Sequence, residues 1–236
     1  MYEGSFSLIA DIDCILSSMT SLPDIEILFE DSDLMVVNKP AGVLSESSGG
    51  GEASMLDKVS SYLGKRAIAY HRIDRSTSGC LLMGKTARFN KKVSQLFQHK
   101  RIRKEYWAIV EGDWDRGLNK IETYIGALGE GKFGNVEPAK GKLSITTFRV
   151  LKRFGGLTWL QCLPKTGRTH QIRLHCLEGG RPILGDDLYN SNPAETSMAL
   201  HARSIQFPHP NGDGNLEVKA DPPVFWNRWL QSLADQ

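Results

Sequence analysis

The apolar residues of this chain come in short runs, and this feature limits the fold more than any other. The longest uninterrupted runs, such as 34–37 and 80–83, have four or five residues, far fewer than the roughly 20 needed to cross a bilayer. Short apolar runs between turn residues are typical of strands and short helices. With 236 residues, 40% of them hydrophobic, the chain can bury a core. A transmembrane helix, a collagen, a coiled coil and a disordered chain are excluded.

Local patterns predict strands joined by tight turns, with helices at irregular intervals. Apolar residues at helical spacing predict helices over 55–63, after Thr86, over 169–177 and over 223–233. β-rich runs predict strands over 25–30, 34–38, 80–83, 105–111, 121–125, 143–151, 157–163 and 199–207. Segment 45–54, which contains three consecutive glycines, is expected to be a mobile loop. We therefore expect an α+β fold with a mixed, mostly antiparallel central sheet flanked by helices and loops.

Charge is balanced over the whole chain but not along it. Because 29 Lys and Arg face 27 Asp and Glu, net charge argues neither for nor against a nucleic-acid partner. Segment 85–104 holds eight cations and no acid: Lys85, Arg88, Lys91, Lys92, Lys100, Arg101, Arg103 and Lys104. Such a segment suits RNA phosphates, although the charges alone indicate a solvated helix face equally well.

The cysteines and histidines do not indicate a metal site. Four cysteines are scattered along the chain without a Cys-x-x-Cys motif: Cys14, Cys80, Cys162 and Cys176. This usage favours neither zinc nor a disulfide framework and indicates a reducing, cytoplasmic location. His170 and His175 lie in one predicted helix, but a five-residue step turns about 140° around the axis, so they are not expected to share a metal. We interpret each as a structural histidine and expect no metal.

Segment 79–86 matches the phosphate-binding pattern G-x-x-x-x-G-K-[ST] of nucleotide hydrolases. In a true P-loop, a buried strand comes first and the four variable residues form a turn around phosphate. Here the polar segment 71–78 comes first, and the variable residues 80–83 are apolar enough to be the strand. A P-loop nucleotide hydrolase is therefore the least favoured alternative.

Asp74 lies between Arg72 and Arg75, just ahead of the predicted strand 80–83. A carboxylate flanked by cations is expected to stay ionised. At about 4 Å, each cation contributes on the order of 4 kcal/mol at an effective dielectric near 20, before desolvation. Such a carboxylate is a candidate nucleophile or base. On these residues alone, however, a structural ion pair in a turn is the favoured interpretation.

Residues 71–79 resemble the H-R-L-D-x-x-T-S-G signature of RluA-type pseudouridine synthases, with Ile73 in place of the leucine. The family's other motifs are matched, in order, by 28–42, 104–112, 166–175, 182–186 and 199–202. Coincidence does not explain so many ordered matches across roughly residues 25–225. The resemblance implies one catalytic domain over 23–236. Residues 1–22 are expected to form a loosely ordered extension, too short for an N-terminal S4 domain.

The resemblance also implies roles for individual residues. Asp74 matches the catalytic aspartate, which attacks or deprotonates the target nucleotide while its C1′–N1 bond breaks and before C5 joins C1′. Tyr106 corresponds to the tyrosine that stacks on the base and takes the C5 proton, and Arg173 to the basic partner of the aspartate. Expected substrate-binding residues are Ile172 against the base, Arg72 in the gap left by a flipped-out uridine, and His71, Thr77, Lys104 and Arg168.

The implied substrate is a compact stem-loop of ribosomal or transfer RNA, read by shape and by flipped bases. The implied enzyme is a cytoplasmic monomer that needs no cofactor and does not associate with a membrane. A non-catalytic RNA-binding module with the same basic surface is the alternative from another class. The presence of Asp74, Tyr106 and Arg173 argues against that alternative.

Overall fold

A single twisted sheet organises the part of the chain that the computed structural model describes, which is residues 25–47, 49, 51–190, 195, 197–227 and 229. Within it, eleven strands run in the order β1-β2-β4-β10-β5-β9-β8-β6-β7, with β3 beside β4 and β11 beside β10. The strands are β1 Glu26–Glu30, β2 Leu34–Lys39, β3 Ile68–Ala69, β4 Ser78–Gly84, β5 Arg103–Glu111, β6 Lys120–Gly129, β7 Lys132–Asn135, β8 Lys142–Phe154, β9 Leu157–Pro164, β10 Leu200–Pro208 and β11 Asn215–Lys219.

The sheet is mixed because β4 and β10 run parallel, whereas the other named pairs are antiparallel. Gly79 permits this parallel contact, since it has φ +111° and a Cβ there would lie 2.3 Å from the carbonyl oxygen of Ala202. The expected α+β class with a mostly antiparallel sheet is confirmed.

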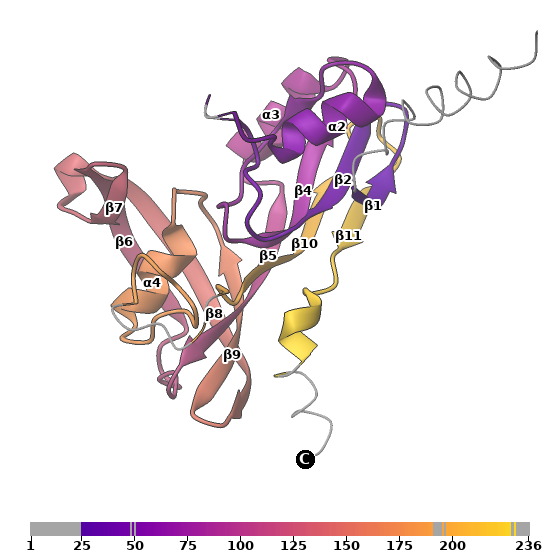
Figure 1. Ribbon diagram of the computed structural model, residues 1–236. Helices are drawn as coiled ribbons and strands as arrows, with labels where there is room; N and C mark the ends of the chain where they lie inside the picture. Colours follow the sequence, from indigo (N-terminus) through magenta and orange to yellow (C-terminus); the bar gives the residue numbers. More distant parts are fainter. Residues whose placement is uncertain are drawn as a thin grey trace, which may run out of the picture.

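Helices α2 Met55–Leu63, α3 Asn90–Gln98 and α4 Gln171–Glu178 lie at the two ends of the sheet rather than over its middle strands (Figure 1). Helices α2 and α3 lie over the end formed by β1, β2 and β4, and α4 contacts β6 and β8 at the other end. Short 3₁₀ helices form at Pro138–Lys140 and Val224–Trp226. The largest apolar core of the described residues surrounds β5 and β9 and includes Ile73, Tyr106 and Ile172. That core therefore supports the residues predicted to form the site.

Two helices begin later than predicted. Helix α3 begins at Asn90 without a side-chain cap, so the prediction of a cap near Thr86 is wrong: the Thr86 hydroxyl donates to Asp33 instead. Helix α4 begins at Gln171, not at 169, because His170 has a left-handed φ of 56° and cannot continue a right-handed helix. Helix α2 agrees with its prediction and starts with a capping box between Ser54 and Asp57.

Some predictions fall wholly or partly outside the described residues. The extension over 1–22 does, as do most of the second half of the terminal helix over 223–233 and positions 48 and 50 of the predicted mobile loop. The two ends of that loop are fixed, since Ser45 and Ser54 are buried and hydrogen-bonded. Among the described residues, no helix is both long and apolar enough to cross a membrane.

The segment that matched the phosphate-binding pattern is a strand followed by a turn. Residues 79–84 pair with β2 along their length, so their amides are not arranged as a loop around an anion. The ammonium of Lys85 pairs with Glu30 and donates to the carbonyl of Asp31 at 2.7 Å. This geometry does not support the nucleotide-hydrolase alternative.

Candidate active site

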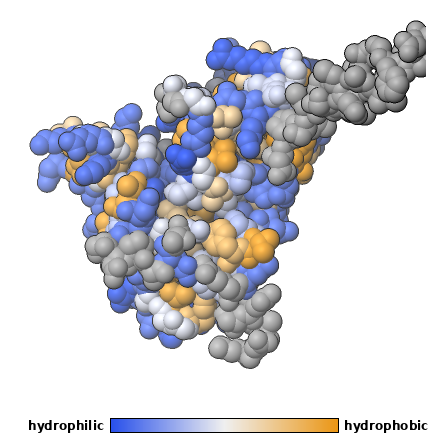
Figure 2. Space-filling model, in the orientation of Figure 1, coloured by the Kyte–Doolittle hydropathy of each residue, from blue (hydrophilic) through white to orange (hydrophobic). Residues whose placement is uncertain are grey.

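A pocket of about 1270 Å³ opens beside β5, between the two ends of the sheet. Its walls come from loops 41–46 and 71–77, the end of α3 with the start of β5, residues 164–173, and the segments before β10. All nine residues predicted for the site line this one pocket: His71, Arg72, Asp74, Thr77, Lys104, Tyr106, Arg168, Ile172 and Arg173. Figure 2 shows mainly hydrophilic residues on the projecting β6–β7 hairpin and on the helices across from it.

The loop that carries Asp74 is fixed through its main chain. The Ser45 hydroxyl donates to the carbonyl of Ile73 at 2.7 Å and accepts from the Ile73 amide at 3.1 Å. The Gly42 amide donates to the carbonyl of Arg75 at 2.8 Å. These bonds hold the main chain on both sides of Asp74, whose side chain reaches the pocket with 25% exposure.

Lys39 is a buried cation that joins the turn after β2 to the same loop. Its ammonium donates to the carbonyls of Pro40 at 2.9 Å, Val43 at 2.6 Å and Arg75 at 3.1 Å. Burial lowers the pKa of Lys39 to about 7, although the negative charge of Asp74 opposes that shift. Sequence reasoning missed this role, because Lys39 drew notice only as part of a motif and nothing nearby indicates a buried lysine.

Asp74 forms no ion pair with Arg72 or Arg75, so the predicted ion pair within this turn is wrong. The Arg75 side chain turns outward, where Nη2 lies 3.0 Å from Glu52 and Nε donates to the carbonyl of Gly42 at 2.8 Å. Arg72 is exposed on the pocket rim and forms no ion pair among the described residues. The cation nearest to Asp74 comes from α4 instead.

That cation is Arg173, which is only 3% exposed and lies among three carboxylates. Its Nε and Nη2 bond both oxygens of Asp186, at 2.8 and 2.5 Å, whereas Asp187 lies at 3.4 Å and Asp74 at 3.9 Å. Although burial opposes it, the bonds and charge of Asp186 raise the pKa of Arg173. The guanidinium thus stays charged, and Asp186 rather than Asp74 fixes its position.

Asp186 is 1% exposed. It lies in the segment 182–186, which matched a family motif, but the sequence assigned Asp186 no role. Besides Arg173, it accepts the amides of Leu188 and Tyr189, each at 3.1 Å. The preceding Gly185 has φ +72°, and a Cβ there would lie 2.3 Å from the carbonyl oxygen of Ser197. The glycine was the available signal for a tight turn, but nothing local indicates that its neighbour bonds α4.

Tyr106 on β5 forms a nearly buried wall of the pocket together with Ile172. Burial raises the pKa of the Tyr106 phenol above its ordinary value, and the negative charge of Asp74 adds to the shift. The phenol is therefore neutral before substrate binds. It can accept a proton only if its own proton moves elsewhere in the same step.

His71, Lys104 and Thr77 line the pocket in different ways. The His71 ring accepts the Leu82 amide at 3.0 Å, and burial first, then the charge of Lys104, lowers its pKa to about 3. His71 is therefore neutral, and its hydrogen bond connects the loop to β4. Burial also lowers the pKa of Lys104. Thr77 is 1% exposed, and its hydroxyl has no hydrogen-bond partner among the described residues.

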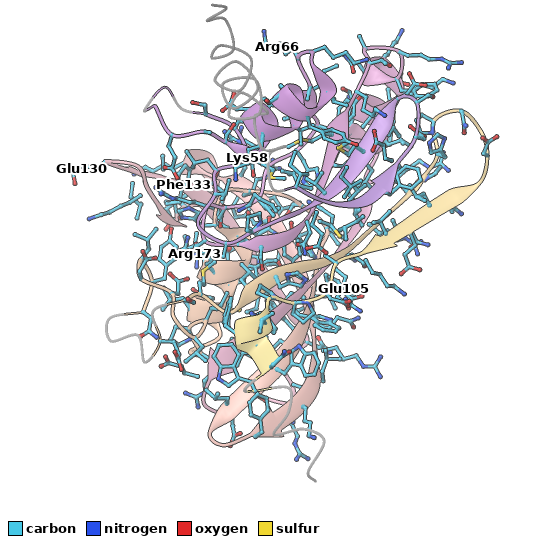
Figure 3. All side chains as sticks on the ribbon, turned by 45° about the vertical axis from the view of Figure 1, so that its right-hand side comes forward. Lys58, Arg66, Glu105, Glu130, Phe133 and Arg173 are labelled. Atoms are coloured by element: carbon cyan, nitrogen blue, oxygen red, sulfur yellow. The ribbon has the colours of Figure 1, made fainter. Side chains whose placement is uncertain are left out.

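The start of α4 is held by a glutamine. The Gln171 side chain accepts from the Thr166 hydroxyl at 2.7 Å and from the Arg168 amide at 3.1 Å. Nearby, the His170 ring bonds the Tyr189 hydroxyl at 2.7 Å, as expected for a structural histidine. Figure 3 shows Arg173 in the interior of the molecule and Phe133 toward one side of it.

The cationic segment 85–104 does not act as one surface. Lys85 pairs with Glu30 and Arg88 with Asp33, whereas Lys100 and Lys104 line the pocket. No group of three or more His, Cys, Asp or Glu side chains in the described part of the chain is arranged to hold a metal.

Solved structures share this architecture. The human protein titled RNA Pseudouridylate Synthase Domain Containing 4 superposes with a TM-score of 0.74 at 22% identity, covering 96% of this chain and 98% of that one. The human Domain Containing 1 protein gives a TM-score of 0.74 at 23% identity, covering 92% and 97%. At this level of identity, the likeness establishes the fold.

Sequence comparisons agree. A family model described as RNA pseudouridylate synthase matches residues 33–178. Ribosomal large subunit pseudouridine synthase C of Buchnera aphidicola is 32% identical over 223 residues, which is 88% of this chain and 70% of the relative. Proteins of the same name are 34% identical in Vibrio cholerae, over 82% of this chain and 64% of theirs, and 29% identical in Escherichia coli, over 92% and 72%.

The fold is thus that of the pseudouridine synthases. The chain belongs to the RNA pseudouridylate synthase family, whose members are isomerases. The resemblance to RluA-type enzymes drawn from the motifs is confirmed.

Proposed function

We propose that this enzyme converts specific uridines of large-subunit ribosomal RNA to pseudouridine, with Asp74 as the catalytic carboxylate. The names of the relatives, ribosomal large subunit pseudouridine synthases, support ribosomal RNA over transfer RNA, the other substrate predicted from sequence. The observation that carries the proposal is that Asp74, Arg173 and Tyr106 line the same pocket.

Asp74 acts at C1′ of the target nucleotide. As the C1′–N1 bond breaks, its electrons leave with the uracil and the ribose develops positive charge, which an ionised carboxylate stabilises. Arg173, 3.9 Å away, helps to keep that carboxylate charged. The detached uracil turns in the pocket, where Ile172 packs against it, and its C5 bonds to C1′.

Loss of the C5 proton completes the isomerisation, and Tyr106 receives that proton. Because its phenol starts neutral, it passes its own proton to a second acceptor as the C5 proton arrives. Asp74 is a suitable acceptor, since its charge already acts on the phenol. Uracil N1, which kept the electron pair of the broken bond, takes up one proton, and Asp74 gives one up, so the sum is an isomerisation with no net change of protons or electrons.

The remaining site residues bind the nucleotide. Arg72, exposed at the rim, occupies the stack vacated by the flipped uridine, and Arg168 and Lys104 attract phosphates. The Thr77 hydroxyl is buried without a hydrogen-bond partner among the described residues, and Thr77 and His71 contribute pocket wall. One chain supplies all these residues, so we propose a monomer, acting without a cofactor in the cytoplasm where ribosomal RNA is made.

The test uses ribosomal RNA from a host that lacks its own synthases. Wild-type protein should form new pseudouridines at discrete positions, with release of tritium from C5-labelled uridine. Asp74→Asn should release none while its RNA affinity stays within a few-fold, because phosphate contacts supply most of the binding. Equal turnover by Asp74→Asn and wild type would overturn the assignment.

A further inference from the structure

A second hollow, of about 290 Å³, lies on the far side of the end of α3. We call it the α3 groove. Lys92, Leu96, His99 and Arg101 line it from the helix and its C-terminal turn, and His209 and Pro210 line it from the end of β10. None of the described residues that line it is acidic. Of the basic residues that line it, His209 alone pairs with a carboxylate of the described part of the chain, that of Asp31.

One turn of chain separates this groove from the catalytic pocket. Phe97, Gln98 and Lys100 line the pocket, whereas His99 and Arg101 line the groove. Neighbouring Cα atoms are about 3.8 Å apart, so Lys100 and Arg101 place adjacent cations on opposite sides of a thin wall. A polynucleotide that leaves the pocket past Lys100 meets Arg101 next.

Two carbonyl groups at this turn are already occupied by hydrogen bonds from amides of the turn, so they do not face a bound anion. The Arg101 amide donates to the carbonyl of Leu96 at 2.8 Å, and the Lys100 amide to that of Phe97 at 3.1 Å. Lys100 has a φ of 54°, in the left-handed region that usually falls to glycine or asparagine at a helix end. A lysine held in this strained conformation beside a catalytic pocket points to a use for its charge.

Among the basic residues at the groove, the Arg101 side chain is free of ion pairs with the described residues, Lys92 is held by a carbonyl and His209 by a carboxylate. Arg101 is exposed and forms no ion pair in the described part of the chain. The Lys92 ammonium donates to the carbonyl of Pro210 at 2.9 Å, which links the two walls. Asp31, 2.7 Å from the ring of His209, holds that ring in place. Leu96 and Pro210 offer an apolar surface on which a base can pack.

We propose that the α3 groove binds one nucleotide of the RNA strand next to the target uridine, with its phosphate on Arg101 and its base against Leu96 and His209. This inference rests on the proposed function, because the same RNA must enter the catalytic pocket. The volume of about 290 Å³ lies just below the range of about 300–1,000 Å³ for small-ligand pockets, which suits a single nucleotide rather than a duplex.

The test compares Arg101→Glu and Arg101→Gln with the control Arg66→Glu. Arg66 is exposed, lines neither hollow and lies at the edge of the molecule in Figure 3. Binding of a large-subunit ribosomal RNA transcript is measured over a series of salt concentrations. For Arg101→Glu we expect Kd to rise roughly tenfold and the slope of log K against log salt to fall by about 1. Arg101→Gln should show a smaller loss, and Arg66→Glu almost none.

Single-turnover release of the C5 proton at saturating RNA should stay within about twofold of wild type, as for a contact that acts only in binding. An Arg101→Glu variant that binds RNA like Arg66→Glu would overturn the inference and leave an acidic peptide as the better occupant. A slower saturating rate would also overturn it. If wild type forms no pseudouridine, the proposed function fails, yet the salt dependence still tests the groove as an RNA contact.

Discussion

Replacing Asp186 by asparagine tests the idea that a buried carboxylate outside the reaction positions Arg173. The change preserves size and one oxygen acceptor for the amides of Leu188 and Tyr189, but removes the charge that binds the guanidinium at 2.5 and 2.8 Å. Arg173 would then be a buried cation whose closest carboxylates are Asp187 and Asp74, at 3.4 and 3.9 Å.

The magnitude follows from the burial of both partners. Removing one member of a buried ion pair costs about 3–5 kcal/mol, and the two remaining carboxylates favour the lower end of that range. For a chain of this size, about 3 kcal/mol lowers Tm by roughly 6–12 °C. Proton release should also slow, roughly 10–100-fold, because a misplacement of about 1 Å costs up to about 10²-fold.

Asp187→Asn is the matched control, since Asp187 also faces Arg173 but is 78% exposed. An exposed pair contributes about 0–1 kcal/mol, so this variant should unfold within a few degrees of wild type. The assays are thermal unfolding by circular dichroism and single-turnover tritium release with matched RNA binding. The reasoning is refuted if Asp186→Asn unfolds and turns over like Asp187→Asn.

Three further outcomes are expected. Tyr106→Phe should bind RNA normally but release the C5 proton roughly 10²–10⁴-fold more slowly, if the hydroxyl relays that proton; near-normal release would reduce Tyr106 to a stacking surface. Because the pKa of Lys39 falls from 10.5 to about 7 on folding, the unfolded chain binds the extra proton above pH 7, so stability should rise with pH between 7 and 9 by up to about 1.4 kcal/mol per unit. Urea unfolding of Lys39→Met, which should lack this slope, checks the sign. Neither wild type nor Lys85→Ala should bind ATP in isothermal titration, and saturable binding lost in Lys85→Ala would revive the P-loop interpretation.

Local sequence patterns predicted most of the fold because its strands coincide with short apolar runs. The apolar run 80–83 predicts a strand, and β4 spans Ser78–Gly84. Helix starts were harder: Thr86 has the chemistry of a cap, yet its hydroxyl bonds Asp33, a residue 53 positions away. Long-range competition of this kind is invisible in a sequence window.

The members of the pocket could be predicted because motif resemblance carries residue identity, but their partners could not. Arg75 adjoins Asp74 in sequence, yet its side chain points to Glu52. Arg173 approaches Asp74 from another element and takes Asp186 as its main partner. Sequence proximity predicts charge pairs poorly because backbone direction in a loop decides where each side chain points.

The attachment of the Asp74 loop has a consequence for how the enzyme can diversify. The Ser45 hydroxyl, the Lys39 ammonium and the Gly42 amide bond main-chain atoms of the loop, at Ile73 and Arg75, and the Arg75 side chain adds one bond, to the Gly42 carbonyl. The position of the carboxylate is therefore set by groups that every amino acid carries. Exposed side chains of the loop can be substituted without displacing the carboxylate. A library randomised at position 75 should therefore keep many active members, whereas one randomised at Ser45 should keep few. New RNA preferences can thus evolve through substitutions at the pocket rim, while the catalytic carboxylate keeps its position.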